Sequence, residues 1–164
     1  LAAAACAVAV GVKLPQIAAG LASVSVVAGR QEIKLLANGA KVIDDSYNAS
    51  PSSFEVAIDV LSGFSGRRIL VMGDMAELGP DELMLHRHVG EYARQAGLDD
   101  LYSVGVLSAG AAEIFGGRHF ESRDSLIEAL TYELQSPEST CLVKGSRSSG
   151  MERIVEMLLL QGKP

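Results

Sequence analysis

The chain has 164 residues, which is enough for one full domain and little more. Hydrophobic residues make up 48% and charged residues 21%, a balance that supports a sizeable buried core and excludes a disordered segment. The formal net charge is −6 and no basic cluster is present, which excludes the usual signature of nucleic-acid binding, so we expect no nucleic-acid partner.

The N-terminal run 1–10 is apolar and rich in alanine. It is too short to span a bilayer and has no basic flank, so it predicts neither a membrane helix nor a signal peptide. We therefore expect a core helix, no membrane partner and a cytoplasmic location. The sequence begins with Leu1 instead of Met, which favours a partial chain. Cys6 and Cys141 have apolar neighbours and no metal-ligand spacing, so we interpret both as buried thiols in a reducing compartment.

Two short helices are expected first, over 1–10 and 15–21, with Pro15 well suited to the first turn of the second helix. The weaker stretch 22–29 follows, and we place a domain boundary there. The expected domains are residues 1–27 and 28–164.

Strands and helices alternate from residue 41 onward. Before them, Asn38-Gly39 between apolar segments predicts a hairpin, because both residues tolerate a positive φ. The expected strands cover 32–37, 41–44, 68–73, 101–105, 118–120 and 140–144. The expected helices are one after Ser50-Pro51 with Phe54, Ile58 and Leu61, two over 80–97 and 109–115, and one with Leu126, Leu130 and Leu134. A last helix is expected to begin at Ser149, with Glu152 completing a capping box. This order predicts an α/β fold, a Rossmann-like, mostly parallel sheet with helices on both faces, preceded by two short helices.

Ligands of such sheets bind beyond the carboxyl ends of the strands. In the first loop of interest, Asp44 and Asp45 are adjacent carboxylates, which repel each other unless they are paired or solvated. They suit ribose hydroxyls or a metal; the alternative is a polar turn in which Ser50 or Ser52 caps the next helix. The aromatic ring of Tyr47 is expected either to pack over a ligand or to cover the end of the sheet.

A second loop, 73–80, follows the most hydrophobic strand and lacks a dinucleotide fingerprint. Its Asp74 and Glu77 are compatible with a site or with an ordinary connecting loop. His86 and His88 are two residues apart on a helix and point to different faces, so we predict no metal site. His86 lies near the apolar stripe, which favours a packed, hydrogen-bonded histidine.

The third loop places Lys144 and Arg147 between a strand end and a helix N-terminus, together with Ser146 and Ser148. Cations, hydroxyls and free backbone amides favour a bound carboxylate or phosphate. The alternative is capping serines with two solvated cations. No phosphate loop and no Ser–His–Asp or Cys–His arrangement occurs in the sequence, so we expect no catalytic residue in this chain.

Three motifs in this order resemble the C-terminal domain of the D-alanyl-D-alanine-adding members of the Mur ligase family. They are Asp-Asp-Ser-Tyr-Asn-Ala-Ser-Pro at 44–51, Gly-Asp-Met-Ala-Glu-Leu-Gly at 73–79 with His86 downstream, and Val-Lys-Gly-Ser-Arg-Ser-Ser-Gly-Met-Glu at 143–152. The resemblance covers nearly the whole chain and is weak before Gly29. It implies that residues 1–27 end a central ATPase domain and that the rest forms the C-terminal Rossmann-like domain.

The resemblance implies an ATP-dependent amide ligase of peptidoglycan precursor synthesis. In that chemistry ATP phosphorylates the carboxylate of a UDP-N-acetylmuramoyl-tripeptide, and the amine of D-alanyl-D-alanine attacks the acyl phosphate. ATP and Mg2+ are the implied cofactors, with Mg2+ held mainly by the central domain, and the fragment alone is expected to be inactive. Its implied partners are the two substrates and the N-terminal and central domains of the same protein. Two alternatives stay open: a free-standing α/β anion-binding module and a folylpolyglutamate-type ligase domain.

The resemblance also assigns roles to residues, in three groups. The implied ATP-binding residues are Arg30, Asp45 and Asn48. The implied dipeptide-binding residues are Lys144, Ser146, Arg147 and Ser148. The residues with an implied supporting role are Asp44, Tyr47, Asp74, Glu77 and His86.

Overall fold

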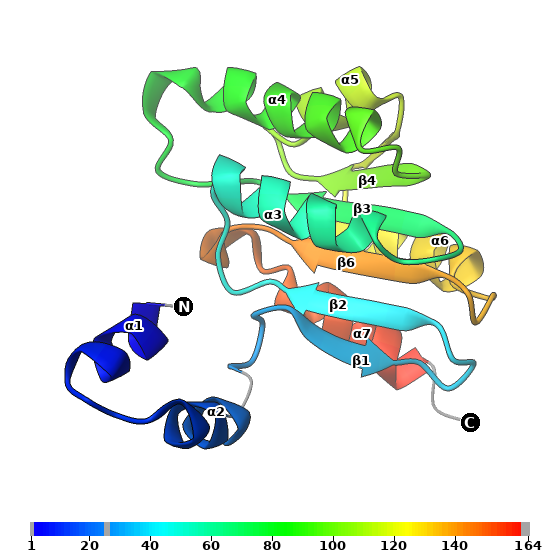
Figure 1. Ribbon diagram of the computed structural model, residues 1–164. Helices are drawn as coiled ribbons and strands as arrows, with labels where there is room; N and C mark the ends of the chain where they lie inside the picture. The colour runs from blue at the N-terminus through cyan, green and yellow to red at the C-terminus, as the bar shows by residue number, and fades with distance from the viewer. Residues whose placement is uncertain (1, 25–26, 162–164) are drawn as a thin grey trace.

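The computed structural model describes residues 2–24 and 27–161, so Leu1 and part of the expected boundary stretch lie outside the described residues. Six strands form one sheet in the order β1-β2-β6-β3-β4-β5 (Figure 1). The parallel strands are β2 (Lys41–Asp45), β6 (Thr140–Lys144), β3 (Arg68–Gly73), β4 (Asp100–Val104) and β5 (Arg118–Phe120), and β1 (Glu32–Leu35) is antiparallel to β2. The predicted turn at Asn38-Gly39 joins β1 to β2, with Gly39 at a φ of +91°. The predicted mostly parallel sheet is confirmed.

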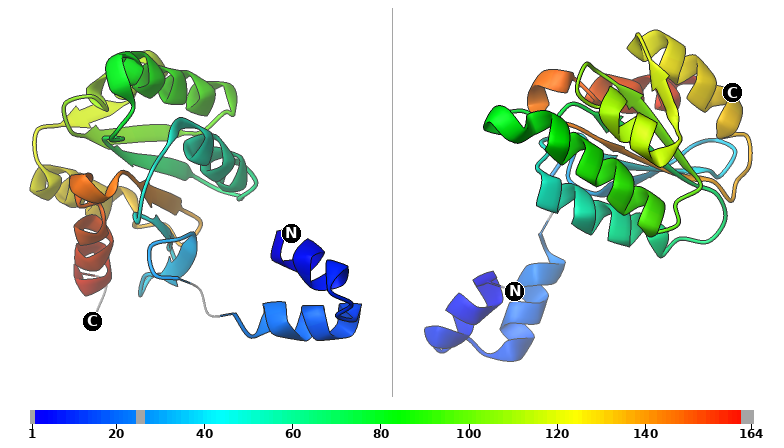
Figure 2. Two further views of the ribbon diagram at one scale, coloured as in Figure 1. Left: turned by 90° about the vertical axis from the view of Figure 1, so that its left-hand side faces the viewer. Right: turned by 90° about the horizontal axis from the view of Figure 1, so that it is seen from above.

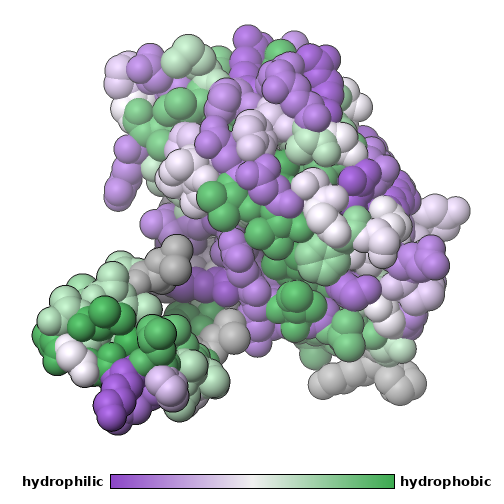
Figure 3. Space-filling model, in the orientation of Figure 1, coloured by the Kyte–Doolittle hydropathy of each residue, from purple (hydrophilic) through white to green (hydrophobic). Residues whose placement is uncertain are grey.

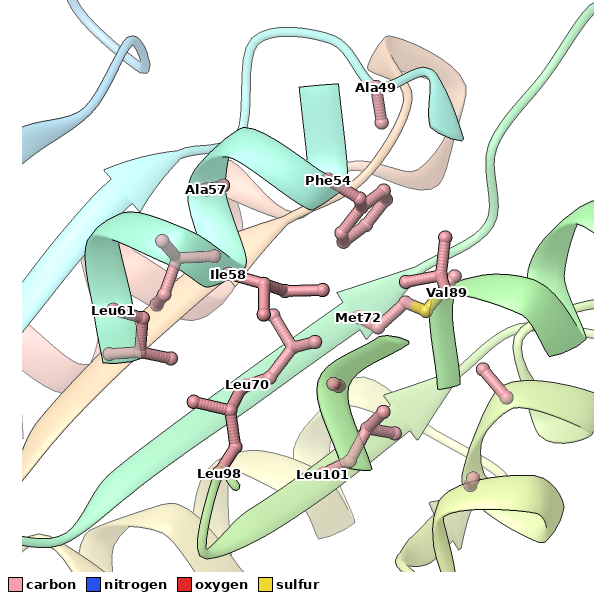
Figure 4. Packing of buried hydrophobic residues seen from close by; sticks show 14 of the residues in the cluster. Ala49, Phe54, Ala57, Ile58, Leu61, Leu70, Met72, Val89, Leu98 and Leu101 are labelled. Carbon is pink, nitrogen blue, oxygen red and sulfur yellow. The ribbon is translucent and has the colours of Figure 1, made fainter. Parts of the chain in front are cut away.

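Helices cover both faces of this sheet (Figures 1 and 2). One face carries α3 (Pro51–Ser62), α4 (Glu82–Gln95) and α5 (Ala109–Phe115), and the other carries α6 (Arg123–Glu133) and α7 (Glu152–Gln161). Figure 4 shows Phe54, Ile58 and Leu61 of α3 packed near Leu70 and Met72 of β3, and all five side chains are fully buried. Burying one such side chain stabilises the fold by about 1.5–3 kcal/mol. The apolar run of β3 is thus buried on both faces, as its sequence predicts.

Helices α1 (Ala2–Ala9) and α2 (Leu14–Ala22) lie off the sheet, beyond the edge toward which the parallel strands point (Figure 1). Neither helix buries a residue, and apolar surface gathers over this part of the molecule in Figure 3. The expectation that both cysteines are buried is therefore wrong for Cys6, which is exposed, because no other described segment covers α1; Cys141 in β6 is buried. No described helix is long and apolar enough to cross a membrane.

The predicted start of the last helix at Ser149 is wrong. A 3-10 turn, η2 (Arg147–Ser149), comes first, and α7 begins only at Glu152. Gly150 between them has a φ of +60°, a left-handed conformation that interrupts helical geometry. The hydroxyl of Ser149 donates to the carbonyl oxygen of Ser146 at 2.6 Å, so it forms no capping box with Glu152.

Candidate functional site

A buried ion pair joins the carboxyl ends of β2 and β6. Asp45 and Lys144 are the last residues of these adjacent parallel strands and are register partners. The ammonium of Lys144 donates to Asp45 Oδ2 at 2.6 Å and to the carbonyl oxygen of Asn48 at 3.1 Å. Only 2% of Lys144 and 8% of Asp45 is exposed. The ammonium also lies 5.5 Å from the ring centroid of Phe54, so the lysine is held from three sides.

Asp44 has a different cation. Its carboxylate accepts from the ammonium of Lys34 at 2.8 Å, and from the hydroxyl and the amide of Ser46 at 2.6 and 3.2 Å. Burial alone raises the pKa of Asp44, but these hydrogen bonds outweigh it and hold the pKa below its ordinary value. Successive strand residues point to opposite faces. The expected repulsion between Asp44 and Asp45 is thus relieved by one lysine for each carboxylate.

The Asp45 pocket is a hollow of about 510 Å³ over these strand ends. Arg30, Asp45 and Asn48 line it, so the structure brings the three expected ATP-binding residues together. Arg30 is exposed, and its guanidinium lies 4.4 Å from the centroid of the Tyr47 ring. Lys144 also lines this pocket.

The segment just before β1 is fixed to the loop that follows β2. The amide of Tyr47 donates to the carbonyl oxygen of Gly29 at 3.0 Å, and the amide of Gln31 donates to Asp45 Oδ1 at 3.2 Å. Gly29 has a φ of +73°, and a Cβ there would lie 3.1 Å from the Tyr47 nitrogen. Gln31 has a φ of +51°, which is uncommon for a residue other than glycine. The sequence does not predict that Gln31 lines the pocket, because no sequence signal indicates this backbone conformation.

The Arg147 pocket, of about 590 Å³, lies on the other side of residues 48–50, which line both hollows. Ser146, Arg147 and Ser148 line it, with Glu77 of the loop after β3. The Arg147 side chain is 70% exposed, and its guanidinium lies 6.0 Å from the Tyr47 ring centroid.

The expected grouping of Lys144 with the dipeptide-binding residues is not what the structure shows. Its ammonium is engaged with Asp45 and with the Asn48 carbonyl oxygen, and it lines the Asp45 pocket instead. The reason is geometric: Lys144 is the last residue of β6 and pairs in register with Asp45, whereas Ser146, Arg147 and Ser148 lie in the loop that follows β6.

Asp74 is a structural residue that fixes three loops at this edge of the sheet. Its carboxylate accepts from the backbone amides of Val106, Leu107 and Ser108 at 2.9, 3.1 and 2.8 Å. Its carbonyl oxygen accepts from the amide of Ser146 at 2.9 Å. Asp74 therefore supports the Arg147 pocket without lining it.

The buried His86 supports the same loop from α4. Its Nε2 accepts from the amide of Met75 at 2.8 Å, so Nδ1 carries the hydrogen that points to the Glu82 carbonyl oxygen at 2.6 Å. His88, on the other face of α4, lies 2.7 Å from Glu55. The prediction of a packed His86 is confirmed. No group of three or more His, Cys, Asp or Glu side chains that could hold a metal occurs among the described residues.

Comparison with known proteins adds to this geometry. A family model described as Mur ligase, glutamate ligase domain, matches residues 29–147, well over half of the chain. The chain belongs to the Mur ligase family. The UDP-N-acetylmuramoyl-tripeptide–D-alanyl-D-alanine ligase of Escherichia coli is 43% identical over 164 residues, which cover 99% of this chain and 36% of that protein. The matched chain thus spans about a third of the length of this relative.

Solved structures of Mur ligases have the same fold. MurF from Acinetobacter baumannii superposes with a TM-score of 0.87 at 32% identity, over 97% of this chain and 36% of that one. MurF from Thermotoga maritima, solved in complex with ADP, superposes with a TM-score of 0.80 at 28% identity, over 96% and 36%. The part matched to the Mur ligase family model includes every residue that lines the two pockets except Ser148.

Proposed function

We propose that the chain is the C-terminal part of an ATP-dependent ligase that adds D-alanyl-D-alanine to UDP-N-acetylmuramoyl-tripeptide in peptidoglycan precursor synthesis. The observation that carries this proposal is the pair of pockets on either side of residues 48–50, one with Arg30 and Asp45 and the other with Arg147. The 43% identical relative, which bears that name, supports it. We assign residues 1–27 to the end of the central ATPase domain, residues 28–164 to the C-terminal Rossmann-like domain, and the protein to the cytoplasm.

The Asp45 pocket suits a nucleotide. Arg30 supplies an exposed cation for phosphate oxygens. A carboxylate has about four acceptor positions, and Gln31 and Lys144 occupy two on Asp45, which leaves positions for ribose hydroxyls. Val56, 56% exposed at the pocket wall, offers apolar surface to a base. We assign Mg2+ to the central domain, because the described residues gather no cluster of carboxylates for it.

The Arg147 pocket suits the carboxylate of the dipeptide. A guanidinium binds a carboxylate through two parallel hydrogen bonds, and the hydroxyls of Ser146 and Ser148 lie 3.0 Å apart beside it. In the proposed reaction the terminal phosphoryl group of ATP is transferred to the tripeptide carboxylate. ADP is the other product of this step. The dipeptide amine, in its neutral form, then attacks the carbonyl carbon, phosphate leaves, and the amine nitrogen loses a proton to solvent as the amide forms. This chain contributes the binding of nucleotide and dipeptide, and His86, Asp74, Asp44 and Tyr47 support the loops that do so.

The test uses the full-length protein that contains this chain, with phosphate release as the readout. We expect turnover with ATP, the tripeptide substrate and D-alanyl-D-alanine, and none from the 164-residue chain alone. Arg147→Ala is expected to raise KM for the dipeptide about tenfold or more with little change in KM for ATP. Arg30→Ala, at an exposed residue of the Asp45 pocket, is expected to raise KM for ATP with little change in KM for the dipeptide. Turnover with glutamate instead of the dipeptide would favour a folylpolyglutamate-type ligase, and no turnover with any acceptor would favour an anion-binding module.

A further inference from the structure

Glu77 has an unusual backbone in an otherwise well-fixed loop. Its φ is +61°, although it carries a full side chain, and such a conformation persists only where the surroundings enforce it. On the N-terminal side, the amide of Met75 donates a hydrogen bond to His86 Nε2. On the C-terminal side, Gly79 begins the 3-10 turn η1 (Gly79–Asp81) that leads into α4. The loop thus presents Glu77 at the surface in a fixed place.

The carboxylate of Glu77 makes no hydrogen bond or ion pair with the described residues, yet it lines the Arg147 pocket. Arg147 lines the same pocket, and its side chain is 70% exposed, with a 3.8 Å ion pair to Glu152 and the Tyr47 ring centroid at 6.0 Å. One hollow therefore holds one available carboxylate and one available guanidinium, together with the hydroxyls of Ser146 and Ser148. Opposite charges at separate places in one hollow are complementary to a zwitterion.

We propose that Glu77 binds the amino end of the acceptor dipeptide, while Arg147 and the two serines bind its carboxylate. This inference rests on the proposed function, which assigns the Arg147 pocket to the dipeptide. Two extended residues span about 7 Å, so one dipeptide fits in a hollow of about 590 Å³ whose lining includes both Glu77 and Arg147. Glu77 is then a specificity-determining residue: it selects a free amine, the group that forms the new amide, and fixes its direction.

The test compares D-alanyl-D-alanine with its N-acetylated form in the full-length protein. For Glu77→Gln, which keeps the shape of the side chain, we expect KM for the dipeptide to rise about tenfold, with no change in KM for ATP. The inhibition constant of the N-acetylated dipeptide, which has no ammonium, is expected to stay the same. Arg147→Gln is the matched control and should weaken both forms, because both keep the carboxylate.

Glu77→Gly separates binding from backbone strain. Glycine adopts a positive φ without a Cβ penalty, so this variant should melt at the same or a higher temperature and still lose affinity for the free dipeptide. An unchanged dipeptide KM in Glu77→Gln, or a parallel weakening of the N-acetylated form, would overturn the inference while leaving the proposed function intact. If the parent protein does not use the dipeptide at all, the proposed function fails and the role of Glu77 fails with it.

Discussion

Replacing Lys144 with methionine removes the cation from a buried carboxylate. The side chains of Lys144 and Asp45 are 3% and 11% exposed, and their charged atoms lie 2.6 Å apart. Removing one partner of a buried pair costs about 3–5 kcal/mol, because the other charge stays buried without compensation. Methionine keeps an unbranched chain beside Phe54, so most of the loss should come from charge and not from packing.

Urea unfolding followed by far-ultraviolet circular dichroism measures this loss, since the chain has no tryptophan. With a denaturant slope of about 1–3 kcal/mol per molar urea, the midpoint should fall by at least about 1 M. Lys34→Met is the matched control. It removes a lysine that is 25% exposed, and Asp44 keeps its bonds from Ser46, so we expect a loss of about 1 kcal/mol.

A double-mutant cycle completes the test. Asp45→Asn combined with Lys144→Met removes both charges and should be less costly than the sum of the two single changes. A loss below about 1 kcal/mol for Lys144→Met, or additive single effects, would refute the buried ion pair.

Three further predictions concern the rest of the domain. The pKa of Asp44 is lower in the folded state than in the unfolded state, where it is about 3.9. The ionised Asp44 therefore stabilises the fold above about pH 3.9, and this contribution is lost as the pH falls through the folded pKa. In Asp44→Asn, the free energy of unfolding should therefore fall less steeply in acid than in the parent chain. Burial raises the pKa of the Cys141 thiol, so a thiol reagent should label Cys6 alone in the native protein and both cysteines after unfolding. A methyl group at Gly90 would overlap the carbonyl oxygen of an α5 residue, so Gly90→Ala should lower the free energy of unfolding in urea by about 1–3 kcal/mol. Gly63→Ala is the control: its methyl group would make an ordinary contact at 3.4 Å, so the free energy of unfolding should change by less than about 0.5 kcal/mol.

The order of strands and helices could be read from the sequence because each element repeats a local pattern. The apolar run of β3 and the 3.6-residue spacing of Phe54, Ile58 and Leu61 report burial directly. The start of the last helix could not be read in the same way. Ser149 and Glu152 have capping-box spacing, but Gly150 takes a left-handed φ and Ser149 closes the preceding turn. The spacing of a capping box alone does not distinguish the start of a helix from a turn that precedes the helix.

The candidate site was predictable as a set of loops and not as a set of contacts. Parallel strands bring their carboxyl ends to one edge, so Asp45 and Lys144 were expected on the same side of the molecule. The individual contacts depend on strand register and on the direction of each side chain. Both are set by the pairing of strands that are distant in sequence: Asp45 and Lys144 are 99 residues apart. The sequence, which places a lysine beside serines, therefore predicts an anion ligand, whereas in the structure the charge of Lys144 pairs with Asp45.

One aromatic side chain lies near the cations of both pockets. The Tyr47 ring lies 4.4 Å from the guanidinium of Arg30 and 6.0 Å from that of Arg147, the cations of the two pockets. Its backbone amide is bonded to Gly29, where a Cβ would come within 3.1 Å of the Tyr47 nitrogen. A side chain at position 29 would therefore displace the ring that both arginines pack against. The segment just before β1 thus helps to fix the ring that lies beside both cations.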